Sequence, residues 1–368
     1  MSHPKFDREK LVIKPLSERA NKLEINDCLN SVRLHKWKIS SKGIQCISET
    51  AGKIKSARAL RRPVILSFGA HTIKNGLAPV LIDLMKEGWV THLATNGAGI
   101  IHDWEFSFQG KTSEDVLTNV AQGQFGIWEE TGFFINLAIV IGAYEGLGYG
   151  ESVGKMIHSD GLQIPEVSAL FNEAEKTMRD HPGCAAAAMD LADVISRFDI
   201  KPGFLKIPHP YKQYSVQEAA YALNIPFTGH PMFGHDIIYT HPLNHGAAIG
   251  RTALHDFLSF ADSVSHIENG IYISVGSAVM SPMVFEKSFS MSQNIEVQSG
   301  SHIDHHYMLI VDLTESDWDW KKDGEPPMNN PAYYLRFCKT FHRMGGEMHY
   351  LSADNRDFLL ALSHLLAE

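Results

Sequence analysis

The stretch from Pro63 to Gly110 constrains the fold of this chain more than any other segment. Two short apolar runs, at 64–66 and 91–94, flank an amphipathic run with the spacing of a helix. The first apolar run ends in Ser-Phe-Gly-Ala-His-Thr (67–72), and the second ends in Thr-Asn-Gly-Ala-Gly (95–99). Strand, loop, helix, strand and loop in this order form one βαβ unit, which requires parallel strands.

The same alternation of helix and short apolar strand continues to the end of the chain. We expect further strands at 225–228, 271–275, 307–313 and 347–351, and helices at 129–146, 167–198 (interrupted by His181-Pro182-Gly183), 215–223, 247–264, 331–343 and 357–366. Such alternation predicts an α/β fold with a doubly wound, mostly parallel, Rossmann-like sheet. We expect residues 1–60 to form a helical N-terminal extension and residues 61–368 to form a single Rossmann-like α/β domain.

The composition of the chain argues against some classes of binding partner. The chain has 368 residues, a net charge of −9 and no run of lysines, which argues against nucleic acid or an anionic membrane as partner. Its four cysteines, Cys28, Cys46, Cys184 and Cys338, form no CxxC pair and favour a reducing, cytoplasmic location. The first ten residues contain no apolar signal core, and the apolar window 133–143 is too short to span a bilayer. We expect that window to be a buried helix.

Small and polar residues follow each predicted strand, which indicates a ligand site along one edge of the sheet. In parallel sheets ligands bind outside the carboxyl ends of the strands, where small residues expose backbone N–H groups. Turn chemistry alone explains any one of these strand ends, but six of them on one edge favour a nucleotide site. The candidate cofactor-binding residues are Ser67, Gly69, Ala70, His71, Thr95, Asn96, Gly97, Ala98, Gly99, Asp103, Gly276, Ser277 and Asp312.

Several histidines stand beside acids. The pair His102-Asp103 follows the glycine loop directly, where the imidazole could transfer a proton or bind a ribose or phosphate oxygen, or the pair could cap a helix. His230, His235 and Asp236 form an alternative site for a divalent metal, and so do His302, Asp304 and His306, which share one face of an extended chain.

The order of motifs resembles the deoxyhypusine synthase family. Residues 67–76 correspond to its TSN-x-x-SSG-like loop and residues 95–103 to its TTAGG-x-EED loop. Residues 105–111 (EFSFQGK) and 224–227 (NIPF) match two further short segments. Lys339 precedes Tyr350 by eleven residues, which is the spacing of the family's lysine before a VYADA-like strand.

This resemblance implies a Rossmann-like, NAD-binding enzyme that forms a homo-oligomer, either a dimer or a tetramer, with Lys339 as the imine-forming residue. His102 and His235 would then move protons. We also expect the Trp318 and Trp320 side chains to pack in the core or at a subunit interface.

The departures from the family concern the polyamine substrate. The paired glutamates of the family fall on Ile101 and His102, and an apolar side chain cannot bind an ammonium group. Residues 229–236 replace the family's TDGS-x-GD segment, and Lys339 stands in Phe-Cys-Lys-Thr where the family has SWGK. We therefore expect a small-molecule substrate other than a protein lysine.

Three hypotheses follow from the sequence. The first is a cytoplasmic, NAD-dependent transferase of deoxyhypusine synthase-like type that transfers an amine or alkyl group through a lysine imine. The second is a metal-dependent hydrolase that uses the His/Asp clusters. The third is a catalytically silent nucleotide-binding protein.

Overall fold

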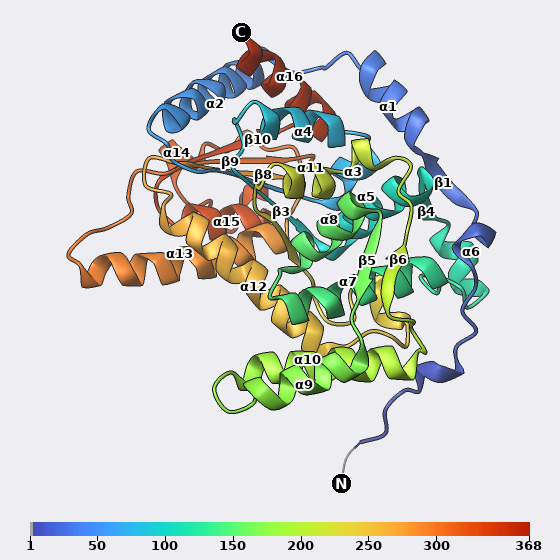
Figure 1. Ribbon diagram of the computed structural model, residues 1–368. Coiled ribbons are helices and arrows are strands. Elements are labelled where there is room, and N and C mark those ends of the chain that lie inside the picture. Colours follow the sequence, from blue (N-terminus) through green and yellow to red (C-terminus); the bar gives the residue numbers. More distant parts are fainter. Residues whose placement is uncertain (1–2) are drawn as a thin grey trace.

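The computed structural model describes residues 3–368 and contains a central sheet of six parallel strands (Figure 1). The strands lie in the order β10 (Glu347–Ser352), β9 (Tyr307–Asp312), β8 (Ile271–Val275), β2 (Val64–Phe68), β3 (His92–Asn96) and β7 (Phe227–His230). Numbered along the chain within this sheet, the order from β7 to β10 is 3-2-1-4-5-6, the doubly wound order of nucleotide-binding folds. The predicted fold class is confirmed.

Helices cover both faces of the sheet because its strands are apolar on both sides. The side chains of Val64, Leu66 and Phe68 belong to one hydrophobic cluster, whereas Ile65 belongs to the other. The helices α2 (Ser41–Ala59), α4 (Ala78–Lys86), α11 (Val216–Ala222) and α16 (Asn355–Ala367) contribute to the first cluster. The helices α12 (Gly246–Ser265), α13 (Met280–Gln298) and α15 (Arg336–His342) cover the opposite face (Figure 1).

The remaining elements surround this core. The helices are α1 (Ile25–Leu34), α3 (Ala70–Lys74), α5 (Gly97–Gln109), α6 (Val116–Ala121), α7 (Glu129–Glu145), α8 (Tyr149–Ser159), α9 (Val167–Thr177), α10 (Pro182–Arg197) and α14 (Trp320–Asp323). Two antiparallel pairs join β1 (Asn21–Glu24) to β4 (Lys111–Glu114) and β5 (Gly161–Ile164) to β6 (Gly203–Lys206). Short 3₁₀ turns lie at Arg8–Lys10, Leu16–Glu18, Lys212–Tyr214, Ile237–Thr240 and Pro331–Tyr334.

Several predicted boundaries follow from local chemistry. Helix α10 begins at Pro182, where a missing N–H costs nothing, so the expected break between two helices is present. Helix α7 ends at Gly146, whose φ of 77° suits glycine. The helix expected over 331–343 is instead a 3₁₀ turn followed by α15, because Leu335 between them has a φ of −74° and a ψ of 66°, outside the helical region.

The segment before residue 61 contributes to the core of the sheet domain. It contains the expected helices α1 and α2, but also strand β1, which pairs with β4. Leu16, Ile47 and Ile54 are almost fully buried in the same hydrophobic cluster as β2 and β8. No break in packing therefore separates this segment from the rest of the described chain.

The two tryptophans predicted to pack in the core or at a subunit interface pack against the core. Trp320 is 1% exposed and belongs to the hydrophobic cluster of α13 and α15. Trp318 is partly buried against the same cluster and donates its Nε1–H to the carbonyl of Gly324 at 2.9 Å. Trp320 therefore packs in the core and not at a subunit interface, because the loop after β9 folds back over the sheet.

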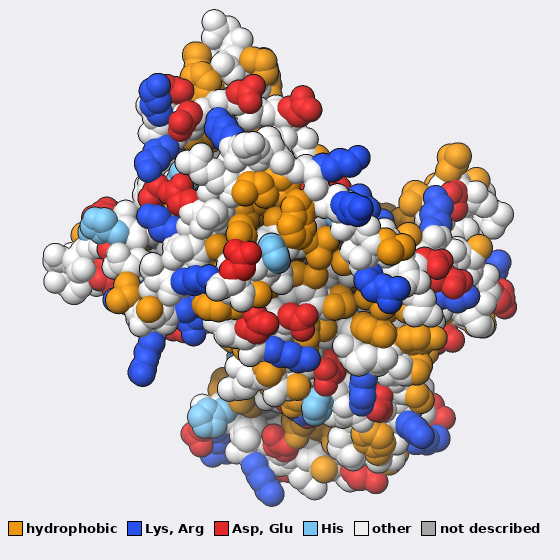
Figure 2. All heavy atoms as spheres, turned by 90° about the horizontal axis from the view of Figure 1, so that it is seen from above, with side chains coloured by type: hydrophobic (Ala, Val, Ile, Leu, Met, Phe, Trp, Pro, Cys, Tyr) orange, Lys and Arg blue, Asp and Glu red, His pale blue; other side chains and the backbone are white. Residues whose placement is uncertain are grey.

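Between residues 3 and 368, no single helix is long and apolar enough to cross a membrane. Helices α7 and α8, which are bent against each other, reach the necessary length and apolar composition only when they are taken together. The face of the molecule in Figure 2 carries Lys and Arg side chains interspersed with Asp and Glu around a central strip of hydrophobic side chains. Positive charge does not gather into one patch on this face.

The loops after β2 and β8 meet at the point where the strand order reverses, and we expect glycine at position 69 to be required there. A Cβ atom on Gly69 would lie 2.1 Å from the carbonyl oxygen of Gly276, which is backbone and cannot rotate away. We expect Gly69→Ala to lower the free energy of unfolding by about 1–3 kcal/mol, the usual cost of overpacking. Urea titration followed by circular dichroism measures this change.

Gly250→Ala is the matched control, because Gly250 lies in α12 with nothing within 4 Å of an added Cβ atom. We expect this variant to be neutral or more stable by up to about 1 kcal/mol, since alanine favours a helix. Equal stabilities of the two variants would show that the close approach of the two loops is not rigid.

Candidate functional site

A cavity of about 250 Å³ lies at the carboxyl edge of the sheet, where the segments that follow β2, β3 and β7 meet. Lys74 ends the short helix after β2. Ala98, Ile101, His102 and Glu105 lie on successive turns of α5, which begins directly after β3. His235, Asp236 and Ile237 follow β7, and the remaining lining residues are Arg19, Ser113, Glu114, Val116 and Phe125.

The N-terminus of α5 opens onto this cavity. Asn96 caps the helix by accepting a hydrogen bond from the N–H of Gly99 at 2.9 Å. A Cβ atom on Gly97 would lie 2.1 Å from Oδ2 of Asp236, so this carboxyl group is packed directly against the first residue of the helix. Glycine at position 97 is what allows the acid to approach.

Asp236 is a buried acid with an unsatisfied oxygen. Its side chain is 2% exposed, and among residues 3–368 its Oδ2 has no hydrogen-bond partner. Burial raises the pKa of Asp236 to about 6, although the nearby His235 lowers it. Within the described part of the chain, the hydroxyls of Tyr149 and Tyr239 are also buried without a partner, and the charge of Asp236 adds to burial in raising the pKa of both. Three polar groups in this region therefore remain free to bind a ligand or a water molecule.

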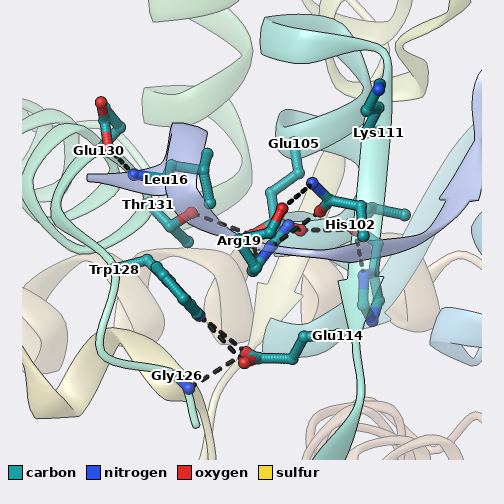
Figure 3. A network of polar contacts seen from close by, with 12 residues as sticks. Leu16, Arg19, His102, Glu105, Lys111, Glu114, Gly126, Trp128, Glu130 and Thr131 are labelled. Atoms are coloured by element: carbon teal, nitrogen blue, oxygen red, sulfur yellow. Dashed lines mark hydrogen bonds and ion pairs between the residues drawn. The ribbon is translucent and has the colours of Figure 1, made fainter. Parts of the chain in front are cut away.

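A buried ion pair stands on the opposite wall (Figure 3). Arg19 donates two hydrogen bonds to Glu105, at 2.7 Å and 2.8 Å, and both side chains are 1% exposed. Thr131 also donates to Glu105, at 2.9 Å. Desolvation raises the pKa of Glu105, but the Arg19 charge and these hydrogen bonds outweigh it, so the pKa lies below its ordinary value. Glu105 is therefore ionised at neutral pH.

His102 is linked to this ion pair through Thr112. The ring nitrogen Nδ1 lies 2.7 Å from Oγ1 of Thr112, and that hydroxyl donates to Oε2 of Glu105 at 2.5 Å. Burial lowers the pKa of His102 to about 4, so the imidazole is neutral at neutral pH. A neutral imidazole that lines a cavity can accept a proton from a bound molecule.

Glu114 closes the outer side of the cavity and is fully engaged by the protein. It accepts hydrogen bonds from the Gly126 N–H and from Nε1 of Trp128, both at 3.1 Å, and from the amide of Asn119 (Figure 3). This carboxylate holds the loop before α7 in place and has little remaining capacity for a ligand.

The structure brings some of the predicted site residues together at the edge. Gly97, Ala98 and Gly99 form the first turn of α5, and His102 and His235 line its cavity. Gly69, Ala70 and His71 begin α3, and Gly276 and Ser277 follow β8 at the same edge. The loops after β2 and β3 share this edge because the two strands are parallel neighbours.

Other predicted residues serve the protein itself. Asp103, predicted as a cofactor-binding residue, is instead engaged by the protein: it is 1% exposed and accepts four hydrogen bonds, from the hydroxyl of Ser215, the N–H of Val216, and the N–H and side-chain amide of Gln217. It caps α11, because the helical period turns it away from His102. Thr95 donates its hydroxyl to the carbonyl of Phe68, Ser67 is buried inside β2, and Asp312 accepts from the N–H and the hydroxyl of Thr314.

Lys339 lies away from this cavity. It stands in α15, where its Nζ atom is 3.1 Å from Oε1 of Glu325 and 3.5 Å from the centre of the Tyr333 ring. Helix α15 packs on β10, at the edge of the sheet opposite to β3 and β7. Strands are about 4.8 Å apart, so the sheet position of β10 is roughly 19 Å from that of β3. The structure therefore does not bring Lys339 together with His102.

The predicted metal clusters do not form. His230 lies 3.0 Å from the hydroxyl of Thr228, which also contacts the buried His92, while the side chain of His235 is 62% exposed. His302 contacts Asp304, but His306 is buried against Phe289. Within the described chain, the one group with three ligand atoms close together is Glu49, Glu347 and His349. There Glu347 already contacts Lys53 and Lys321, which supply the positive charge that a metal would bring.

Sequence reasoning missed the acids and bases that complete the cavity. Glu105 stands one helical turn after His102, so the spacing of three residues in a helix after the glycine loop could have identified it. No local sequence pattern could have identified Arg19 as a site residue, because 86 positions separate it from its partner Glu105.

No family model matches this sequence, and no curated protein matches it significantly. Among solved structures, the chain is similar to a complex of AgrE with ornithine and NAD+ (16% identity, 90% of this chain and 34% of that chain, TM-score 0.43). It is also similar to ArgZ, an arginine dihydrolase from cyanobacteria (14% identity, 88% and 32%, TM-score 0.38), and to a LOR/SDH protein from Methanococcus maripaludis S2 (11% identity, 90% and 73%, TM-score 0.43).

The chain spans about a third of the length of AgrE and ArgZ. The identities of these three structures to the chain are 11–16%, and their TM-scores are 0.38–0.43. The Rossmann-like assignment therefore rests on the strand order and the parallel pairing of the sheet itself.

The ion pair between Arg19 and Glu105 generates a prediction about stability. We expect Arg19→Met to lower the free energy of unfolding by about 3–5 kcal/mol, because it leaves a buried carboxylate without its counter-charge. The control is Lys201→Met, which removes an ion pair with Asp199 whose side chains are 78% and 86% exposed. That change should cost less than about 1 kcal/mol. A loss in Arg19→Met no larger than in the control, measured by urea titration, would contradict the prediction.

Proposed function

We propose that this chain is an enzyme that binds NAD at the carboxyl edge of its sheet and transforms a small molecule in the cavity beside α5. One observation carries the proposal: a cavity at the carboxyl ends of β2, β3 and β7 contains a neutral histidine, a buried unsatisfied carboxyl group and a lysine. Ligands of doubly wound sheets bind at this edge. A volume of about 250 Å³ suits a metabolite-sized molecule.

The fit of NAD is supported by the backbone at the point where the strand order reverses, between β2 and β8. Gly69 and Gly276 place no side chain there, and Gly276 has a φ of 58° with open space around the position of a Cβ atom. Backbone without side chains is what a diphosphate group needs for close approach. When bound, NAD would supply a hydride acceptor. Because Asp103 is engaged by α11, the contact with the ribose has to come from another residue.

We assign a separate role toward the small molecule to each side chain of the cavity. His102 accepts a proton from it. The free Oδ2 of Asp236 accepts a hydrogen bond from a donor group, and Lys74, which stands on the other side, attracts a negatively charged one. His235 lies at the exposed rim, where it can exchange protons with solvent.

The family resemblance implies a more specific reaction, the transfer of an amine or alkyl group through an imine on Lys339. The surroundings of Lys339 do not favour that reaction. The expected homo-oligomer, a dimer or tetramer, is favoured by the exposed Val116, Leu117 and Val120 on α6, beside the mouth of the cavity. A cytoplasmic location also stays a prediction.

NAD binding tests the proposal directly. We expect isothermal titration of NAD into the chain to show stoichiometric binding, and Gly276→Ala to weaken it about ten-fold or more, because the new methyl group occupies the open space left for the diphosphate group. Gly88→Ala is the control, because Gly88 also has a positive φ and nothing within 4 Å of an added Cβ atom, and it should bind NAD as the wild type does. Absence of NAD binding to the wild type rejects the cofactor, and unchanged binding by Gly276→Ala rejects its position.

Borohydride trapping tests the role of Lys339. We expect incubation with NAD, a candidate amine and borohydride to leave Lys339 unlabelled, because its amine is engaged by Glu325 and the Tyr333 ring. Mass spectrometry of tryptic peptides measures the label. A label on Lys339 in the wild type, together with no label in Lys339→Gln, would support the imine mechanism instead.

A further inference from the structure

The hydrogen bonds around Thr112 determine where its single hydroxyl proton lies. Glu105 is ionised and receives both arms of the Arg19 fork, so it has no proton to donate. The short contact of 2.5 Å between Thr112 and Glu105 must therefore be donated by the Thr112 hydroxyl. Once this proton is used, the Thr112 oxygen can only accept a hydrogen bond from its other neighbour.

That other neighbour is the Nδ1 atom of His102, at 2.7 Å. Because Thr112 has no second proton, Nδ1 must carry the hydrogen of this contact. A neutral imidazole has one N–H, so Nε2 of His102 carries a lone pair. Between residues 3 and 368, no protein group forms a hydrogen bond with Nε2, and the ring lines the cavity.

We propose that Thr112, Glu105 and Arg19 are positioning residues that fix His102 in its Nδ1–H tautomer, with Nε2 as the proton acceptor toward the cavity. This inference deepens the proposed function, on which its catalytic meaning rests. The tautomer itself is a property of the protein without any ligand. Figure 3 shows how the contributing side chains converge from the N-terminal segment and α5.

The arrangement serves a proton transfer in a definite way. A bound molecule with an acidic O–H or N–H group gives its proton to Nε2, and the electron pair of the broken bond stays on that molecule. His102 then becomes an imidazolium ion, whose Nδ1–H still points at Thr112 and, through it, at the negative charge of Glu105. The Glu105 charge and the oriented hydroxyl offset part of the burial cost of this ion without reorganisation. The proton on Nδ1 stays where it is, and the proton on Nε2 returns to the product.

Arg19 has a separate part in this chain of contacts. It holds Glu105 ionised in a buried position, and an ionised Glu105 is the condition for Thr112 to donate toward it. A protonated Glu105 could donate to Thr112 instead, which would turn the Thr112 hydroxyl toward Nδ1 and move the histidine proton to Nε2. The positive charge of Arg19 thus determines which group donates in the hydrogen bonds that join Glu105, Thr112 and His102.

Nitrogen-15 NMR of histidine-labelled protein at pH 7 tests the tautomer. His102→Gln assigns the His102 signals by difference among the 20 histidines. We expect a protonated-type shift for Nδ1 and an unprotonated-type shift for Nε2. In Thr112→Val, which keeps the shape but loses the hydroxyl, we expect the two shifts to move toward a mixture of tautomers, and in Thr112→Ser we expect the wild-type pattern to return.

Thr131→Val is the matched control. It also removes one hydroxyl donor to Glu105, at Oε1, but Thr131 has no contact with His102. We expect its His102 spectrum to match the wild type. A wild-type spectrum with the proton on Nε2, or a Thr112→Val spectrum unchanged from the wild type, would overturn the inference.

The same samples separate this inference from the proposed function. Isothermal titration with NAD is expected to give equal affinities for the wild type, Thr112→Val and Thr131→Val, because Thr112 acts on the histidine and not on the cofactor. Failure of all three to bind NAD would reject the proposed cofactor and leave the tautomer result standing. A Thr112→Val spectrum unchanged from the wild type, with normal NAD binding, would reject the positioning role alone.

Discussion

The buried ion pair between Arg19 and Glu105 is the interaction on which the candidate site depends. A carboxylate that is 1% exposed is costly unless a counter-charge and hydrogen bonds compensate it, and here Arg19 supplies the charge and two of the bonds. The pair joins the N-terminal segment to α5, and β1 beside it pairs with β4, which carries Thr112. Without this pair Glu105 could not remain ionised, and the hydrogen bonds that end at His102 would lose their direction.

Desolvation acts differently on the two walls of the cavity. On one wall both carboxylate oxygens of Glu105 accept hydrogen bonds from the protein, so burial produces an ionised network. On the opposite wall Oδ2 of Asp236 has no partner, and burial raises the pKa of this acid to about 6. The carboxylate of Glu105 is therefore satisfied by the protein, whereas that of Asp236 keeps an oxygen for a ligand. This contrast is the physical basis for placing the substrate between them.

The strands could be predicted because their signal is local. Runs such as Val64–Leu66 and Ile271–Val275 are apolar on both faces, as buried parallel strands require, and polar residues follow each of them. The glycine loop at 97–99 was located for the same reason. The polar residues of the site were harder to assign. Asp103 and His102 are neighbours in sequence, yet the helix turns one toward α11 and the other toward the cavity.

The sequence by itself determined the order of strands and helices, the edge of the sheet at which small residues gather, and the presence of a histidine after the glycine loop. These features depend on periodicity and local backbone preferences, which neighbouring residues decide. Only the tertiary structure decided which charges meet: that Arg19 reaches Glu105, that Asp236 rests against Gly97, and that Lys339 pairs with Glu325. The partner of a buried charge is selected by contacts between distant segments, 86 positions apart in the case of Arg19, and no local pattern records that selection.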